Sequence, residues 1–235
     1  MTHIISLNLR GFGDASKCHC LKELLMSKNP FIFLGQETMS ERSKAINLFL
    51  NIKKGWQVVA INSNGRSGGM VAMWNPNYVS FRSFSFFGGI ILSGQLRGLH
   101  GNFNIINIYA PYSNRAVFWN RMQTAGILSL PNLIIMGDYN STLNADEIWG
   151  KYARMDSLAG YLNDLFFSHG LKDIRPHPIA PTWTNKHAGD NFIGKRIDRV
   201  MVKDTILDLM GDPRSMILAA DILDHMPITF TWHGT

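Results

Sequence analysis

The chain has 235 residues, of which 46% are hydrophobic and 17% are charged, a composition that excludes an intrinsically disordered protein and allows one domain with a sizeable core. Its 23 lysines and arginines outnumber its 17 aspartates and glutamates, for a formal charge of +6. This excess suits a polyanionic partner, but the basic residues are scattered, so a merely soluble basic protein stays open as an alternative.

The first half of the chain alternates strands with helices and then continues with strands alone. In chain order we predict a strand over 3–9, a helix over 17–27, a strand over 30–34, a helix over 41–52, a strand over 56–62, a glycine-rich turn over 64–69 and a strand over 70–74. Three strands without helices between them, 78–86, 90–99 and 103–109, then argue for antiparallel pairing.

The second half returns to a mixed order. We predict a helix over 115–128, a strand over 133–136, a helix over 155–168, and strands over 196–202, 215–220 and 227–232. Two α/β-like stretches around an antiparallel centre favour an α/β (α+β) fold, a four-layer αββα sandwich of two mixed β-sheets flanked by helices. Because no linker or low-complexity segment interrupts the chain, we expect a single domain over 1–235.

Two features of the sequence bear on where the protein works. Cys18 and Cys20 suit neither a disulfide framework nor a Cys-x-x-Cys metal site, which indicates a reducing, intracellular setting. The chain has no secretory signal pattern and no apolar run of membrane-spanning length, so we expect no membrane partner.

Several apolar strands end in polar clusters, the place where ligand and catalytic groups collect in layered α/β folds. These clusters contain Asn8, Glu37, Tyr109, Asp138, Asn140, Asp198, Asp224 and His225. Mg²⁺ takes oxygen ligands, so Glu37, Asp138 and Asp224 are reasonable ligands if they converge. A nearby histidine can then stabilise developing charge or move a proton.

Taken singly, each cluster has an ordinary structural interpretation. Glu37 can begin a helix, Asn8 can belong to a turn, and Tyr109 can be a core aromatic. The segment 138–140 can form a turn closed by its own side chains, and 224–225 can cap the last strand. Asp198 can pair with a neighbouring arginine on the surface of a strand.

Taken together and in order, six segments resemble the endonuclease/exonuclease/phosphatase superfamily over essentially the whole chain. They are Ser6-Leu7-Asn8, Gln36-Glu37-Thr38, Ile108-Tyr109-Ala110-Pro111, Gly137-Asp138-Tyr139-Asn140, Arg196-Ile197-Asp198-Arg199 and Asp224-His225-Met226-Pro227-Ile228. Within the superfamily, the chain is most similar to the endonuclease domain of plant non-LTR (LINE-type) retrotransposons. That likeness lies in Asn8 to Gly11, in Gly65 to Gly69 and in Pro181-Thr182-Trp183-Thr184.

The resemblance implies a role for each site residue. Glu37, Asn8 and Asp224 would bind the metal, expected to be Mg²⁺ with Mn²⁺ as a substitute, and Tyr109 would support the phosphate side. Asp138 would position or deprotonate the attacking water with help from Asn140. Asp198 would orient His225, which would contact the scissile phosphate. Substrate contacts are expected from Arg10, Arg66, Arg115, Thr182 and Trp183.

The implied activity is Mg²⁺-dependent nicking of DNA that leaves a 3′-hydroxyl and a 5′-phosphate, as in target-primed retrotransposition. We accordingly expect a monomeric domain, fused to or derived from a reverse-transcriptase polyprotein, that reaches DNA in the nucleus. Two departures from the family pattern matter. Leu223 replaces the usual serine before Asp224, and Arg10 stands where abasic-site endonucleases carry an acid.

Two other functions stay open at this stage. One is a phosphoesterase of the same fold that acts on RNA, a sugar phosphate or a lipid headgroup. The other is a catalytically impaired relic that only binds nucleic acid, an alternative that Leu223 raises.

Overall fold

Two large β-sheets form the centre of the computed structural model, which describes residues 3–65, 67–152, 154–219 and 223–233. The first sheet runs in the order β14 (Arg214–Ile217), β15 (Ile228–Thr231), β1 (Ile4–Asn8), β2 (Ile32–Gln36), β4 (Ser67–Trp74) and β3 (Gln57–Asn64). The second runs in the order β10 (Leu171–Asp173), β13 (Asp198–Lys203), β8 (Leu133–Asp138), β7 (Phe103–Tyr109), β6 (Gly89–Leu96) and β5 (Val79–Phe86).

Both sheets are mixed, as predicted. Strands β1 and β2 are parallel and are joined through helix α1 (Ala15–Lys28). Strands β7 and β8 are parallel and are joined through helix α3 (Arg115–Thr124). Parallel neighbours need such a crossover, whereas the helix-free run β5, β6, β7 pairs antiparallel through short turns.

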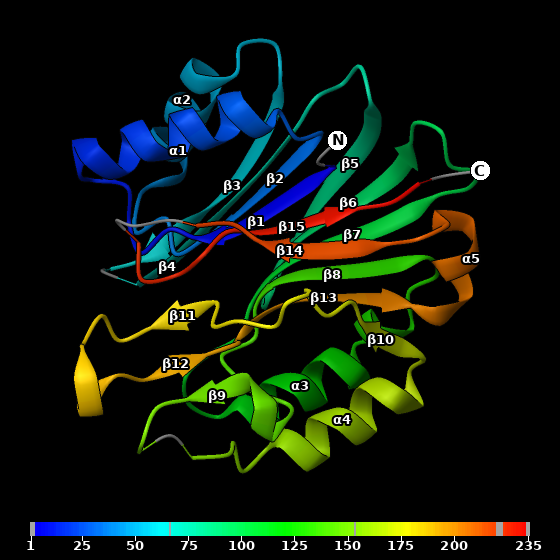
Figure 1. The fold of residues 1–235 in the computed structure, drawn as a ribbon. Coiled ribbons are helices and arrows are strands. Elements are labelled where there is room, and N and C mark those ends of the chain that lie inside the picture. Colours follow the sequence, from blue (N-terminus) through cyan, green and yellow to red (C-terminus); the bar gives the residue numbers. More distant parts are fainter. Residues whose placement is uncertain (1–2, 66, 153, 220–222, 234–235) are drawn as a thin grey trace.

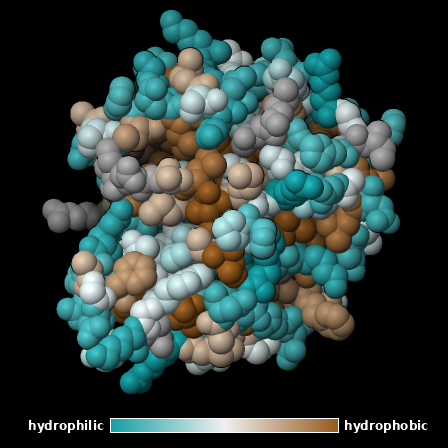
Figure 2. All heavy atoms as spheres, viewed as in Figure 1, coloured by the Kyte–Doolittle hydropathy of each residue, from teal (hydrophilic) through white to brown (hydrophobic). Residues whose placement is uncertain are grey.

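Helices cover the outer face of each sheet, which confirms the four-layer sandwich (Figure 1). Helices α1 and α2 (Arg42–Ile52) pack on the first sheet, and α3 and α4 (Ala159–Ser168) pack on the second. Side chains alternate between the two faces of a strand, so Ile4 packs between the sheets while Ile5 packs toward the helices. Hydrophilic residues cover most of the face seen in Figure 2, and hydrophobic residues are visible between them.

The same alternation places the predicted polar residues between the sheets. Asn8 lies four residues after the inward-facing Ile4, and Asp138 lies two residues after the inward-facing Met136. Just below them, the Gln36 Nε2 atom donates to Ser6 Oγ at 3.0 Å and to Asn107 Oδ1 at 2.6 Å, which ties the first sheet to the second. The polar strand ends therefore meet at one end of the sandwich.

Several predicted boundaries differ from the structure. The predicted helix 155–168 begins only at Ala159, because the Asp156 carboxylate accepts the Leu158 N–H and closes a turn before it. The predicted helix 115–128 ends at Thr124 and is followed by a 3-10 turn, Ile127–Ser129. The predicted strand 196–202 is displaced, since β13 begins at Asp198.

Other elements were not predicted or fall partly outside the described residues. The unpredicted ones are short: strands β9 (Ile148–Trp149), β10, β11 (Trp183–Thr184) and β12 (Gly194–Lys195), helix α5 (Leu207–Met210) and 3-10 turns at Ala145–Glu147, Gly189–Asn191 and Asp204–Ile206. The predicted strand 215–220 is observed as β14, and its last residue lies outside the described part of the chain. None of the described helices is long and apolar enough to cross a membrane.

Candidate active site

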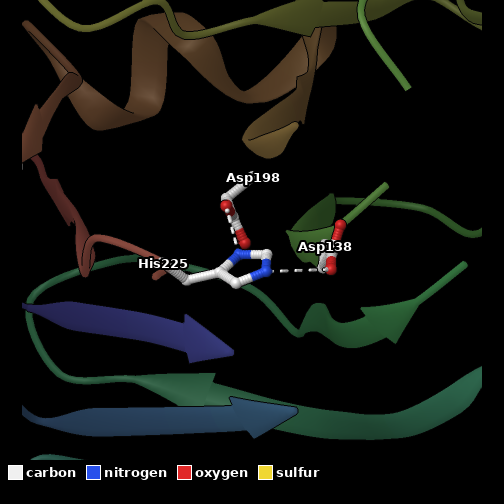
Figure 3. Close-up of side chains that lie close together, drawn as sticks. All are labelled: Asp138, Asp198 and His225. Atoms are coloured by element: carbon white, nitrogen blue, oxygen red, sulfur yellow. Dashed lines mark hydrogen bonds and ion pairs between the residues drawn. The ribbon is translucent and has the colours of Figure 1, made fainter. Parts of the chain in front are cut away.

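Three buried side chains from separate parts of the chain meet at this end of the sandwich (Figure 3). The His225 imidazole lies between two carboxylates, with Nδ1 3.0 Å from Asp198 Oδ2 and Nε2 4.0 Å from Asp138 Oδ2. His225 and Asp138 are fully buried, and Nε2 has no hydrogen-bond partner. Because Asp198 occupies Nδ1, Nε2 is the nitrogen that can face a substrate atom.

Backbone pairing positions these three residues. Asp198 and Asp138 are direct cross-strand partners in β13 and β8. His225 precedes β15 and forms an isolated β-bridge with Trp183. This bridge is flanked by hydrogen bonds from Thr184 N to the Asp224 carbonyl at 3.0 Å and from Met226 N to the Thr182 carbonyl at 2.7 Å. The predicted Thr-Trp segment therefore holds the histidine loop in place.

Thr182 lies beneath this site and away from solvent. Its side chain is fully buried, and its hydroxyl oxygen accepts N–H groups from Ile197 and Asp198, each at 3.0 Å. This placement argues against the direct substrate contact predicted for Thr182. It favours a role in positioning Asp198 instead.

Replacing Thr182 with valine tests this role. The change removes the acceptor of two buried N–H groups, so we expect it to lower the free energy of unfolding by about 1–3 kcal/mol and to reduce catalytic activity through a misplaced Asp198. Thr182→Ser keeps the hydroxyl and is the matched control. Urea unfolding measures the first effect. Equal free energies of unfolding for the two variants would show that the hydroxyl does not stabilise the fold.

Asp138 is held from two sides. Asn8 Nδ2 donates to its Oδ2 at 2.9 Å, and the Asn140 backbone N–H donates to its Oδ1 at 2.8 Å. Asn140 takes a left-handed conformation at φ 48° and donates its own amide to the Ala110 carbonyl at 2.6 Å. Residues 138–140 thus form the turn considered above, and this turn orients the Asp138 carboxylate.

Burial and mutual charge shift the pKa values of the central groups. Burial and the nearby Asp198 raise the pKa of Asp138 above its usual range. Burial alone would lower the pKa of His225, but Asp198, with Asp138 and Asp224, raises it to about 9. At neutral pH the imidazole is therefore positively charged, and Asp138 is a stronger base than an exposed aspartate.

The predicted metal ligands lie beside this trio. Glu37 is buried, with Oε1 accepting the Tyr109 hydroxyl at 2.5 Å. The Glu37 Oε2 atom is 3.4 Å from Arg10 Nη1, and Asp224 Oδ2 is 3.1 Å from Arg10 Nε. Burial and the hydrogen bond to Glu37 raise the pKa of Tyr109, so it stays a neutral donor. Glu37 and Asp224 therefore converge on one positive group.

This donor set fits a hard divalent cation. Two carboxylates and an amide provide oxygen atoms, the ligands that Mg²⁺ prefers. Among the described histidines, cysteines and acids, the group whose ligand atoms lie within 4.8 Å of one another is Asp138, Asp198 and His225. We assign the cation to the Glu37 side as a proposal, because the Asp198–His225 hydrogen bond already engages two members of that tighter group.

Beside the acid cluster lies a groove with a volume of about 430 Å³, and Asn140 is one of the residues that line it. The predicted contacts Arg115 and Trp183 line it together with Arg154 and Lys195. Arg115 is also held by Asp156 and by the Asn140 carbonyl, the latter at 2.7 Å. Arg10 lies at the acid cluster instead, and the predicted contact Arg66 lies outside the described residues.

Two acids that support the site were not singled out in the sequence. Arg196 and Arg199, which flank Asp198, are buried and pair with Glu147 and Asp173. The surface pair considered for Asp198 is therefore not formed. The sequence does not indicate that Glu147 or Asp173 pairs with these arginines, because the partners lie far apart in the chain. Glu147 and Arg196, for example, are 49 residues apart.

Leu223 belongs to an apolar cluster of the core. It is 8% exposed and packs in the apolar cluster between the first sheet and α1, with Leu7 and Leu21 among its members. In the fold, this residue contributes to the core.

We therefore expect Leu223→Ser to weaken the fold without improving catalysis. The smaller, polar side chain leaves a gap in an apolar cluster, which costs about 2–3 kcal/mol of unfolding free energy. Leu223→Met keeps the volume and is the control. A Leu223→Ser protein that is as stable as the wild type and more active would contradict this prediction.

Comparison with known proteins agrees with this architecture. The family described as the Endonuclease/Exonuclease/phosphatase family matches residues 5–210. An AP endonuclease from Archaeoglobus fulgidus has a TM-score of 0.75 and 20% identity, with 99% of both chains covered. The endonuclease domain of TRAS1, a telomere-specific non-LTR retrotransposon, has a TM-score of 0.71 and 15% identity, with 99% of both chains covered.

A 3′ phosphatase, NExo (D146N), from Neisseria bound to a product DNA hairpin is similar to the same degree. Its TM-score is 0.71 at 17% identity, and the match covers 99% of this chain and 100% of that chain. No curated protein sequence matches the chain significantly. At these identities the solved structures establish a shared fold.

Proposed function

The chain belongs to the endonuclease/exonuclease/phosphatase family, and we propose that it nicks DNA, leaving a 3′-hydroxyl and a 5′-phosphate. Membership confirms the predicted enzyme class, a metal-dependent phosphodiester hydrolase. The observation that carries the proposal is the unpartnered Nε2 of His225, held between Asp198 and Asp138. An imidazolium there is suited to a phosphate oxygen.

We propose the following roles in the reaction. Asp138, oriented by Asn8 and Asn140, accepts a proton from water as the water oxygen attacks phosphorus. The bond between phosphorus and O3′ breaks, and O3′ takes up a proton from a solvent water molecule as it leaves, which gives the 3′-hydroxyl. His225 stabilises the charge on the phosphate oxygens, and Asp198 keeps its Nδ1 proton in place.

The proposed cation site uses Glu37 and Asp224, with Asn8 beside them and Tyr109 fixing one Glu37 oxygen. When bound, Mg²⁺ or Mn²⁺ supplies positive charge that neutralises the phosphodiester and the departing oxygen. Glu37 lies in the turn that follows β2, where its backbone has φ 48°. The hydrogen bond from Tyr109 fixes the orientation of its carboxylate, as a ligand role requires.

The groove favours a nucleic acid over the smaller alternatives. It combines cationic side chains, Arg154 and Lys195, with the aromatic rings of Trp183 and Tyr112. Cations contact phosphates, and aromatic rings stack on bases, so this lining suits a polynucleotide better than a lipid headgroup. Because Leu223 packs in the core, it gives no support to the impaired-relic alternative.

The likeness to the TRAS1 domain and the plant retrotransposon motifs support a finer proposal. We propose that the chain is the nicking domain of a retrotransposon polyprotein that also carries a reverse transcriptase, and that it acts as a monomer on nuclear DNA.

A plasmid-nicking assay tests the function. The protein is incubated with supercoiled plasmid and Mg²⁺, with EDTA and the variants Asp138→Asn and His225→Ala as controls. We expect Mg²⁺-dependent open circles whose nicks a DNA polymerase extends without prior end repair, since they carry 3′-hydroxyls. Wild-type protein that binds DNA in a salt-sensitive way but never nicks it would favour the relic. Loss of both properties would favour a small phosphorylated substrate.

A further inference from the structure

Arg10 occupies the centre of the proposed cation site. Its guanidinium group contacts Asp224 Oδ2 through Nε at 3.1 Å and Glu37 Oε2 through Nη1 at 3.4 Å. Nη1 is also 3.4 Å from the Tyr112 hydroxyl. One positive side chain thus bridges the two carboxylates that the cation requires.

The backbone around Arg10 is built to present this side chain. Arg10 takes a left-handed conformation at φ 45°, and its N–H donates to Asn8 Oδ1 at 3.1 Å. Its carbonyl accepts the Lys17 ammonium at 2.8 Å, and the next residue, Gly11, donates its N–H to the Glu37 carbonyl at 2.8 Å. A residue other than glycine at positive φ is uncommon, so these bonds hold Arg10 in a specific place.

The Arg10 contacts also occupy atoms that a cation needs. Tyr109 donates to Glu37 Oε1, and the Arg10 guanidinium donates to the other carboxylate oxygen, Oε2. The Arg10 backbone N–H donates to Asn8 Oδ1. A divalent cation held by the same carboxylates would bring a second positive charge close to the guanidinium, and the two would repel one another. The Arg10 side chain is 36% exposed, so its outer end can move toward solvent.

We propose that Arg10 and the divalent cation compete for Glu37 and Asp224. Arg10 neutralises the two acids when no cation is bound, and cation binding displaces its guanidinium toward the Tyr112 side of the site. The displaced group is then free for a phosphate of the substrate, which accounts for the substrate contact predicted for Arg10. This inference rests on the proposed cation site of Glu37 and Asp224.

Titration with Mn²⁺, followed by the electron paramagnetic resonance signal of the free ion, tests the competition without any substrate. The variant is Arg10→Met, which keeps the length of the side chain and removes its charge. Lys195→Met is the matched control, because Lys195 lines the neighbouring groove, to whose lining neither Glu37 nor Asp224 belongs. Glu37→Gln identifies binding at the proposed site, and thermal unfolding of each variant shows that it is folded.

We expect Arg10→Met to bind Mn²⁺ about tenfold more tightly than the wild type or better, because a positive charge next to the cation is removed. Lys195→Met should stay within about twofold of the wild type, since Arg10 and not Lys195 forms the ion pairs with Glu37 and Asp224. Equal or weaker binding by Arg10→Met, with binding still lost in Glu37→Gln, would overturn the competition and leave the cation site standing. Absence of Mn²⁺ binding in both the wild type and Arg10→Met would overturn the inference and the metal-dependent function together.

Discussion

Replacing Asp138 with asparagine is expected to reduce DNA nicking on the order of 10³-fold. Asparagine keeps the shape of the side chain and one acceptor oxygen, so it retains only one of the two bonds from Asn8 Nδ2 and the Asn140 N–H, and it cannot accept a proton from water. Single-turnover nicking rates at saturating Mg²⁺ measure the effect. A rate within about tenfold of the wild type would show that Asp138 is not the base.

The same variant should differ little from the wild type in stability, because removal of a buried charge is opposed by the loss of one of the two hydrogen bonds that Asp138 accepts. Burial and Asp198 raise the pKa of Asp138, which means that folding disfavours its charged form. At neutral pH the charged carboxylate therefore lowers the stability of the folded protein, and a neutral amide removes that effect. Thermal unfolding should show a midpoint within about 5 °C of the wild type, so a lost activity cannot be ascribed to unfolding.

The largest expected effect on stability comes from replacing Glu147 with glutamine. Glu147 is fully buried, with Oε1 2.7 Å from Arg196 Nη1 and 2.9 Å from Arg199 Nη1, and it also accepts the Leu143 N–H at 2.7 Å. Without its charge, two buried guanidinium groups share Asp173 alone. Breaking such a buried network costs about 3–5 kcal/mol, a large share of the stability of an ordinary domain.

Urea unfolding measures this loss. The control is Asp190→Asn, which breaks the exposed ion pair with Lys151 and should change the free energy of unfolding by less than about 1 kcal/mol. Similar losses for the two variants would show that the buried network contributes little.

Because Arg199 Nη2 also donates to the Ser141 carbonyl at 3.2 Å, next to Asn140, we expect reduced nicking in any folded Glu147→Gln protein.

The acid dependence of stability offers an independent check on Glu147. Burial alone would raise the pKa of Glu147, but Arg199, the Leu143 N–H and Arg196 lower it to about 2 from 4.5. A carboxylate with a lowered pKa stabilises the fold above its unfolded-state value, and this contribution is lost as the pH falls toward the folded-state value. The stability difference between the wild type and Glu147→Gln should therefore shrink between pH 4.5 and about pH 2. A difference that stays constant over that range would contradict the assignment.

The amino-acid sequence was sufficient to predict the layered fold, and it drew attention to the polar residues that meet at one end of the sandwich. Period-two and helical patterns identified the long strands and helices, because each long element buries one face. Polar residues at the ends of inward-facing strands, Asn8 and Asp138 among them, were recognised for the same reason. Their joint order was informative where each residue alone was ambiguous.

Which side chains contact one another could not be predicted from the sequence. The pairing of Arg196 and Arg199 with Glu147 and Asp173 depends on packing between segments far apart in the chain, so no local pattern encodes it. The short strands β9, β11 and β12 have too few residues to show a period, and they form because their neighbours offer N–H and carbonyl groups. The position of the Arg10 side chain also depends on segments far apart in the chain. Its place between Glu37 and Asp224 depends on three loops that meet only in the folded protein, so the sequence predicted a substrate contact where the structure places a bridge between two acids.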